Sequence, residues 1–139
     1  MQEPKPSVLF ICVSNAGKSQ MAEALMRKRV GDAASIHSAG TKPKGEVNQE
    51  SAESVERAGA TMEGALSQPI DDHLLRTVDR VIILGNDAQV EPLHDMLATI
   101  ERWDTVEPSE QGIDGDKRMD MIRDDIAQRV DELARELGL

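Results

Sequence analysis

The segment from Val8 to Ser19 constrains the fold more than any other part of the chain, because it combines a strand, a short loop and the start of a helix. Val8 to Ile11 is a continuous apolar run, which is typical of a strand that is covered on both faces. A loop that joins the C-terminal end of a strand to a helix gathers backbone amides at the positive end of the helix dipole. The sequence therefore predicts an anion-binding site between this strand and this helix.

The single cysteine of the chain, Cys12, ends the predicted strand and opens the loop. The field at a helix N-terminus favours the thiolate form of a cysteine, and Lys18 and the Ser19 hydroxyl act in the same direction. The alternative for a lone cysteine is a small buried apolar side chain. The anion loop favours a nucleophilic sulfur that faces a tetrahedral oxyanion. One cysteine cannot form an internal disulfide, so we expect a reducing, cytoplasmic location.

Two kinds of phosphate-binding loop fit this spacing, each with one departure. The nucleotide-binding loop Gly-x-x-x-x-Gly-Lys-Ser/Thr matches at Gly17, Lys18 and Ser19 but has Cys12 in place of its first glycine. The loop Cys-x5-Arg-Ser of the low-molecular-weight protein tyrosine phosphatases, and of the arsenate reductases that share their fold, matches at Cys12, Asn15 and Ser19. Here Lys18 replaces the arginine. The loop alone leaves both open.

The rest of the chain resembles the arsenate reductases of the second family. Short motifs occur in the family's order over about residues 7 to 137. They are Ser19-Gln-Met-Ala-Glu23, Ser38-Ala-Gly-Thr41, Gly45-x-Val47-Asn48, Ser67-Gln-Pro-Ile, Leu74-Leu-x-x-x-Asp79-Arg-Val-Ile82 and Trp103-Asp-Thr-Val-Glu107-Pro108.

Strand and helix patterns alternate along the chain, which predicts an α/β fold with an open parallel sheet and right-handed crossovers. The resemblance implies three layers around a four-stranded sheet in the order 2-1-3-4. A helix over 91–97 remains open, because Pro92 interrupts its pattern. We expect strands over 8–12, 35–38, 80–84 and 99–103, and helices over 18–30, 49–58, 70–77 and 117–137.

The resemblance also implies roles for particular side chains. Cys12 would be the nucleophile, Lys18 the cation that holds the oxyanion, Ser19 the hydrogen-bond partner of the sulfur, and Glu107 the general acid. The loop residues expected to bind the oxyanion are Val13, Ser14, Asn15, Ala16, Gly17, Lys18 and Ser19. Lysine is a point charge that lacks the two-pronged grip of arginine, so we expect weak phosphatase activity.

The cysteine count implies one branch of these reductases. Some members pass oxidation to two further cysteines of their own, whereas this chain has Gly17 where several relatives carry cysteine and has none downstream. The resemblance then implies an arsenate–mycothiol transferase of arsenic detoxification. Its partners would be arsenate, mycothiol as a cosubstrate and a mycoredoxin-type redoxin, with no bound cofactor.

Composition excludes several other functions. The 139 residues predict one domain, with residues 1–6 as a loose lead-in. A net charge of −10 argues against nucleic acids and anionic membranes as partners. The spacing of the three histidines matches no metal site, so we expect no metal. The oligomeric state, monomer or homodimer, remains open.

Three alternatives to the reductase remain at this point. They are a low-molecular-weight phosphatase, a non-catalytic module that binds or senses oxyanions, and a degenerate nucleotide-binding loop.

Overall fold

A four-stranded parallel sheet forms the middle layer of the computed structural model, which describes residues 4–139. The strands lie in the order β2-β1-β3-β4, as expected. Their bounds are Ser7–Cys12 for β1, Ser35–Gly40 for β2, Arg80–Leu84 for β3 and Ile100–Trp103 for β4. Both faces of β1 are buried, with Val8 and Phe10 in one core and Leu9 and Ile11 in the other, which explains why its apolar residues form an unbroken run.

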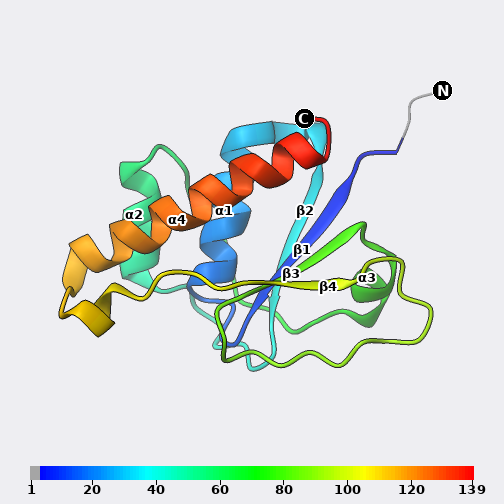
Figure 1. The fold of residues 1–139 in the computed structure, drawn as a ribbon, viewed down its shortest axis with the longest axis horizontal. Coiled ribbons are helices and arrows are strands. Elements are labelled where there is room, and N and C mark those ends of the chain that lie inside the picture. The colour runs from blue at the N-terminus through cyan, green and yellow to red at the C-terminus, as the bar shows by residue number, and fades with distance from the viewer. Residues whose placement is uncertain (1–3) are drawn as a thin grey trace.

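Three helices cover one face of the sheet, and one short helix covers part of the other (Figure 1). The first group comprises α1 (Lys18–Val30), α2 (Gln49–Arg57) and α4 (Gly115–Glu136). On the opposite face lies α3 (Asp72–Thr77), followed later in the chain by irregular structure. Two short 3-10 turns, η1 (Gly31–Ala33) and η2 (Pro108–Gln111), complete the elements. The sheet therefore separates two hydrophobic cores.

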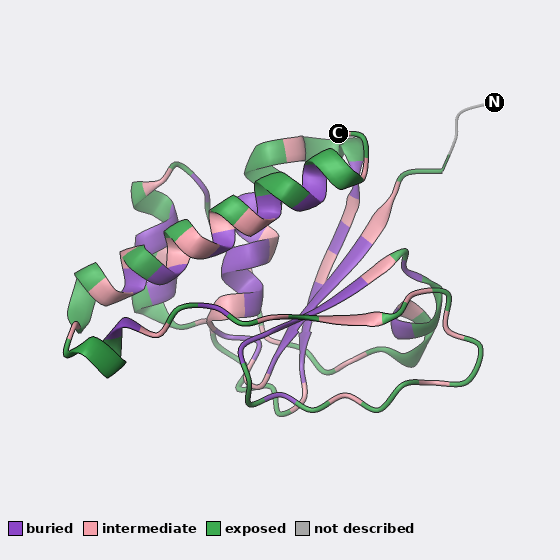
Figure 2. Cartoon of the chain, viewed as in Figure 1, coloured by how far each residue is buried: buried purple, intermediate pink, exposed green. Residues whose placement is uncertain are grey.

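The buried side of α4 matches its sequence period. Met119, Ile122 and Ile126 are buried, and Val130 and Leu133 continue the same stripe against the other helices and the sheet. Figure 2 shows this stripe in purple along the inner side of the helix. The helix begins at Gly115, two residues before the expected start, and ends at Glu136, one residue before the expected end.

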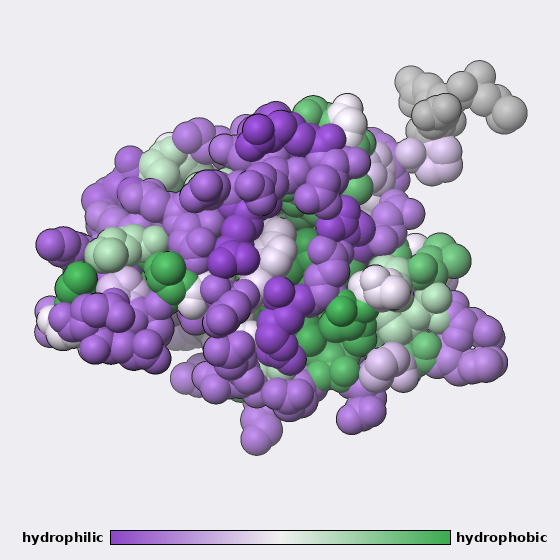
Figure 3. Space-filling view, in the orientation of Figure 1, coloured by the Kyte–Doolittle hydropathy of each residue, from purple (hydrophilic) through white to green (hydrophobic). Residues whose placement is uncertain are grey.

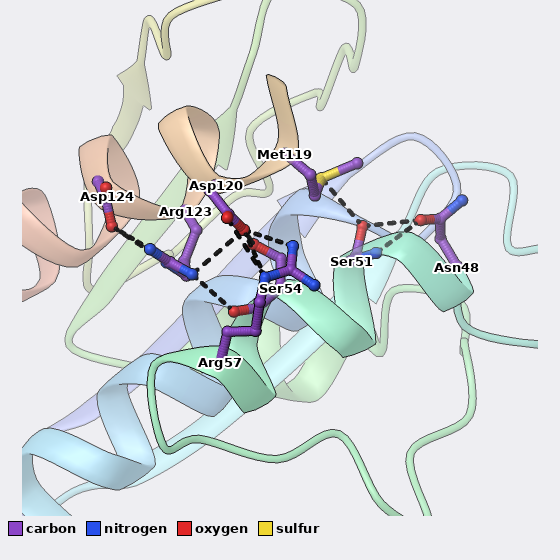
Figure 4. A network of polar contacts seen from close by, with 8 residues as sticks. All are labelled: Asn48, Ser51, Ser54, Arg57, Met119, Asp120, Arg123 and Asp124. Carbon is purple, nitrogen blue, oxygen red and sulfur yellow. Dashed lines mark hydrogen bonds and ion pairs between the residues drawn. The ribbon is translucent and has the colours of Figure 1, made fainter. Parts of the chain in front are cut away.

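A polar network also fastens α4 to α2 (Figure 4). The Asp120 carboxylate accepts hydrogen bonds from the Ser54 hydroxyl at 2.7 Å and from the Arg57 guanidinium. Arg123 donates both to Asp120 and to the Ser54 backbone carbonyl. Hydrogen bonding to Arg57 is the main cause that lowers the pKa of Asp120, so this carboxylate stays charged at neutral pH.

Most elements confirm the sequence prediction, and several differ from it at their ends. β2 extends to Gly40 rather than ending at Ser38, because Gly40 pairs with Cys12 at the end of β1. Residues 91–97 form no helix. The short helix begins at Asp72 rather than at residue 70, because the Asp71 carboxylate caps it by accepting from the His73 and Leu74 amides.

Most of the surface in Figure 3 is hydrophilic, with hydrophobic residues gathered over the region of β4. None of the helices formed by residues 4–139 combines the length and the apolar composition that crossing a bilayer requires. The expected loose lead-in, residues 1–6, falls partly outside the described residues. Pro4 to Pro6 belong to no helix or strand.

Candidate active site

Cys12 lies at the carboxyl end of β1, at the edge of the sheet where parallel α/β proteins bind their ligands. β1 has β2, the next strand in the chain, on one side and β3 on the other, so the order of the strands reverses at β1. Its thiol is free and largely buried, with 7% of the residue exposed, and it lines the pocket that opens at this edge. The strand therefore places the only sulfhydryl of the chain at the floor of a pocket.

Asn15 organises the loop around this sulfur. Its backbone is left-handed, with a φ of 51°, which asparagine tolerates better than most residues. That conformation lets the backbone N–H of Asn15 donate to the Cys12 Sγ at 3.3 Å. The turn at Asn15 thus brings a backbone donor to the sulfur.

The hydrogen bonds of Asn15 also fix the direction of the bond between Ser19 and the sulfur. The Gln68 backbone N–H donates to the Asn15 Oδ1 at 3.0 Å, so the other end of the side-chain amide is its NH₂ group. This NH₂ donates to the Ser19 Oγ at 2.7 Å. The Ser19 hydroxyl hydrogen is then free to point at the Cys12 Sγ, 3.0 Å away. Two donors converge on the sulfur, which stabilises a thiolate.

The remaining loop peptides are oriented by the segment that follows β2. The carbonyls of Cys12, Val13 and Ser14 accept hydrogen bonds from the amides of Thr41, Lys42 and Lys44, at 3.2, 2.8 and 3.2 Å. In a trans peptide the N–H points opposite to the C=O. The N–H groups of these three loop peptides therefore point away from the segment that follows β2. The peptide between Ser14 and Asn15 is an example: its carbonyl accepts from the Lys44 amide, and its N–H donates to the Cys12 sulfur. The loop thus presents N–H groups to an anion beside the sulfur.

The far wall of the pocket comes from α2 and α4. The side-chain oxygen of Asn48 accepts from the Ser51 backbone N–H and caps α2. The backbone N–H of Asn48 donates to the Ala16 carbonyl at 2.7 Å. The Ser51 Oγ lies 3.6 Å from the Met119 Sδ on α4, as Figure 4 shows. The cavity has a volume of about 350 Å³, which leaves room for a second reactant beside a small oxyanion.

The charges around this cavity are mixed. Its lining includes the cations Lys18, Lys44 and Arg118 and the acids Glu46 and Asp87. The Lys18 ammonium lies at the end of β3, where a Cβ on Gly85 would be 3.3 Å from it. In a chain with a net charge of −10, anion binding here depends on these few cations and on the loop amides.

The structure brings most of the predicted site residues together and leaves Glu107 apart. Cys12, Val13, Ser14, Ala16, Gly17 and Lys18 line the pocket, and Asn15 and Ser19 are buried beneath it. Glu107 is not among the lining residues. Its two carboxylate oxygens accept from Arg118, Nε at 2.8 Å and Nη2 at 2.7 Å.

This ion pair bears directly on the general-acid role expected of Glu107. Hydrogen bonding to Arg118, aided by the Ser109 hydroxyl, lowers the pKa of Glu107 to about 2 against the partial desolvation of its carboxyl. A carboxyl group with that pKa carries no proton at neutral pH, so in this arrangement it has none to donate. In this arrangement Glu107 is a negatively charged partner that holds Arg118, a residue of the pocket lining.

Sequence reasoning missed Arg118. It stands at the end of the first turn of a long amphipathic helix among many charged residues, and no local motif distinguishes it from them. Only its ion pair with Glu107, eleven residues away, and its place in the pocket wall reveal it.

The comparisons with known proteins agree with this architecture. The model of the low molecular weight phosphotyrosine protein phosphatases matches residues 7–138. The chain belongs to this family.

Within the family, similar proteins include arsenate reductases. The one from Bacillus licheniformis is 30% identical over 134 residues, which cover 94% of this chain and 96% of that protein. The one from Halalkalibacterium halodurans is 31% identical with the same coverage. The solved thioredoxin-dependent arsenate reductase of Corynebacterium glutamicum superposes with a TM-score of 0.77 at 28% identity, covering 99% of this chain and 64% of that longer chain.

No aromatic side chain lines this pocket among the described residues. The chain has one Phe, one Trp and no Tyr, and Phe10 and Trp103 pack against each other with ring centroids 5.7 Å apart. A phosphotyrosine ring would find no aromatic surface on which to stack.

Proposed function

We propose that this protein is an arsenate reductase that acts as an arsenate–mycothiol transferase. The observation that carries the proposal is the polarised Cys12 sulfur, held by the Asn15 amide and the Ser19 hydroxyl in an anion loop of a chain that has no second cysteine. The arsenate reductases among its relatives support the choice of arsenate. Since no internal disulfide can form, the reducing sulfur has to come from another molecule.

In the proposed reaction, arsenate binds to the amides of residues 13–19 and to Lys18. The thiolate of Cys12 then orients the arsenate, or bonds to the arsenic and leaves again as a thiolate when mycothiol attacks. In the net step the mycothiol sulfur forms a sulfur–arsenic bond, and one arsenate OH leaves as water with the proton that the mycothiol thiol gives up. Arsenic stays pentavalent in this step. A mycoredoxin-type redoxin then attacks the mycothiol sulfur, which gives a mixed disulfide and releases arsenite. The two electrons that reduce the arsenic come from the two sulfurs.

The geometry supports a separate task for each residue in this scheme. Ser19 and Asn15 keep negative charge on the sulfur, and the loop amides bind the arsenate oxygens. Lys18 neutralises the oxyanion without the forked grip of an arginine. The lack of aromatic lining and of that arginine makes phosphotyrosine a poor substrate, so the phosphatase is the weaker candidate.

The test is arsenate-dependent turnover with mycothiol and its redoxin, run beside glutathione and no-thiol reactions, on the wild type and Cys12→Ser. We expect turnover that requires both mycothiol and Cys12. Turnover with glutathione alone would keep the reductase and change its thiol. No arsenate turnover with any thiol would overturn the proposal, and hydrolysis of an aryl phosphate without thiol would then favour the phosphatase.

A further inference from the structure

Arg118 is a pocket residue that the proposed reaction has so far left without a task. It extends from α4 into the lining of the cavity that holds Cys12 and Lys18. The next residue, Met119, contacts Ser51. The Ser51 Oγ in turn lies close to Gly17, 3.5 Å from where a Cβ added to that glycine would stand. This part of α4 therefore stands against the anion loop itself.

Glu107 holds one edge of the Arg118 guanidinium and leaves another edge free to bind. The carboxylate takes the Nε and Nη2 hydrogens, two of the five N–H donors that an arginine has. The edge formed by Nη1 and the second Nη2 hydrogen is a further two-donor fork, which suits two oxygens of a tetrahedral oxyanion. Among the described residues, Glu107 is the partner to which this guanidinium donates.

Arg118 is the one guanidinium in the pocket lining formed by residues 4–139. The other cations there are Lys18 and Lys44, and the acids are Glu46 and Asp87. Lys18 alone supplies a point charge where the loop of this family has arginine.

We propose that Arg118, held in place by Glu107, provides the forked guanidinium that grips the oxyanion in the Cys12 pocket. Lys18 then serves as the general cation of the loop, and an arginine from a distant helix replaces the one missing from the loop. Glu107 is the positioning residue of this pair, because it acts only through Arg118. The inference deepens the proposed function, since it concerns the same oxyanion, but it concerns binding and does not depend on which thiol reacts.

The test is the binding of inorganic phosphate and of arsenate, without thiol, measured by titration calorimetry. We expect Arg118→Gln to weaken both by about tenfold or more, because a charge-assisted hydrogen bond is lost. Arg135→Gln is the matched control, since it removes the same charge from an exposed position in the last turn of α4. Binding by Arg118→Gln equal to that of Arg135→Gln would overturn the proposal, as would a wild type that binds neither anion.

Two further variants separate geometry from charge. Arg118→Lys keeps the charge without the fork, and we expect it to recover only part of the lost affinity; full recovery would overturn the forked contact. Glu107→Gln removes a negative charge, which would tighten anion binding if Arg118 acted as a free charge. We expect weaker binding, because the guanidinium loses its support, and tighter binding would overturn the positioning role.

The proposed function and this inference fail separately. Normal turnover of Arg118→Gln with unchanged phosphate affinity would remove Arg118 from the site and leave the transferase standing. Weakened binding by Arg118→Gln together with no thiol-dependent turnover in the wild type would keep Arg118 in the site and overturn the transferase. Circular dichroism of each variant shows whether the fold is retained.

Discussion

Gly40 and Asn15 pack so closely that only glycine fits at position 40. A Cβ on Gly40 would lie 2.9 Å from the Asn15 nitrogen and 2.7 Å from the Val13 carbonyl oxygen. The Asn15 nitrogen is the donor that points at the Cys12 sulfur. The end of β2 thus sets the position of the anion loop, although the two segments are far apart in the sequence.

Gly40→Ala should therefore damage the site directly. The methyl group has to displace the loop backbone, so we expect a loss of unfolding free energy of about 1–3 kcal/mol and a fall in kcat/KM of about a hundredfold. Denaturant titration and thiol-dependent turnover measure the two effects. Gly112→Ala is the control, because a Cβ there meets open space and only the positive φ is strained. Activity equal to the control would contradict this reading of the contact.

Ser19→Ala should reduce the nucleophilicity of Cys12. The variant removes the hydroxyl that donates to the sulfur and leaves the Asn15 NH₂ without its acceptor. Because Cys12 is the only cysteine, the rate of alkylation by iodoacetamide at pH 7 reports on this thiolate alone. We expect that rate to fall by about tenfold. Thr61→Ala, at a residue outside the lining of the Cys12 pocket, should alkylate at the wild-type rate.

Lys18→Arg should raise hydrolysis of a simple aryl phosphate. A guanidinium in the loop can hold two phosphoryl oxygens at once, and Gly85 leaves space beside the side chain because it has no Cβ. We expect an increase of about tenfold in kcat/KM on p-nitrophenyl phosphate. Lys44→Arg, a pocket lysine outside the loop, should change this rate little. An equal gain in both variants would show that the loop position has no special role.

Glu107→Gln should remove a pH-dependent part of the stability. Arg118 lowers the pKa of Glu107 from 4.5 to about 2, so the stabilisation is fully present above pH 4.5 and is lost as the pH falls towards 2. We expect Glu107→Gln to cost about 1 kcal/mol at pH 7, and the difference from wild type to shrink between pH 4.5 and pH 3. Urea titrations at pH 7, 4 and 3 measure it. Glu110→Gln, an exposed neighbour, should show no such trend.

Asp120→Asn should loosen α4 from α2. The carboxylate accepts from Ser54, Arg57 and Arg123, and a neutral amide keeps the shape but loses the charge that attracts both arginines. We expect a loss of about 1–2 kcal/mol of unfolding free energy. Glu132→Gln, exposed on the same helix, is the control. A loss no larger than in the control would show that apolar packing alone joins these helices.

The sequence by itself determined the strands, the helices and the loop that holds Cys12. These features depend on residues that are neighbours in the chain: the apolar run 8–11 predicts β1, and the helical period from Met119 to Leu133 predicts the buried side of α4. Cys12, Asn15 and Ser19 could be chosen for the same reason, since one loop and one helix turn hold all three.

The tertiary structure decided which distant residues complete the site. Glu107 was singled out from its motif as a general acid, but its partner Arg118 lies on another element, and it is their contact that lowers the pKa of the carboxyl. The close fit of Gly40 against Asn15 likewise depends on how β2 pairs with β1. Periodicity encodes local structure, whereas the protonation and the reach of a side chain depend on the neighbours that folding brings to it.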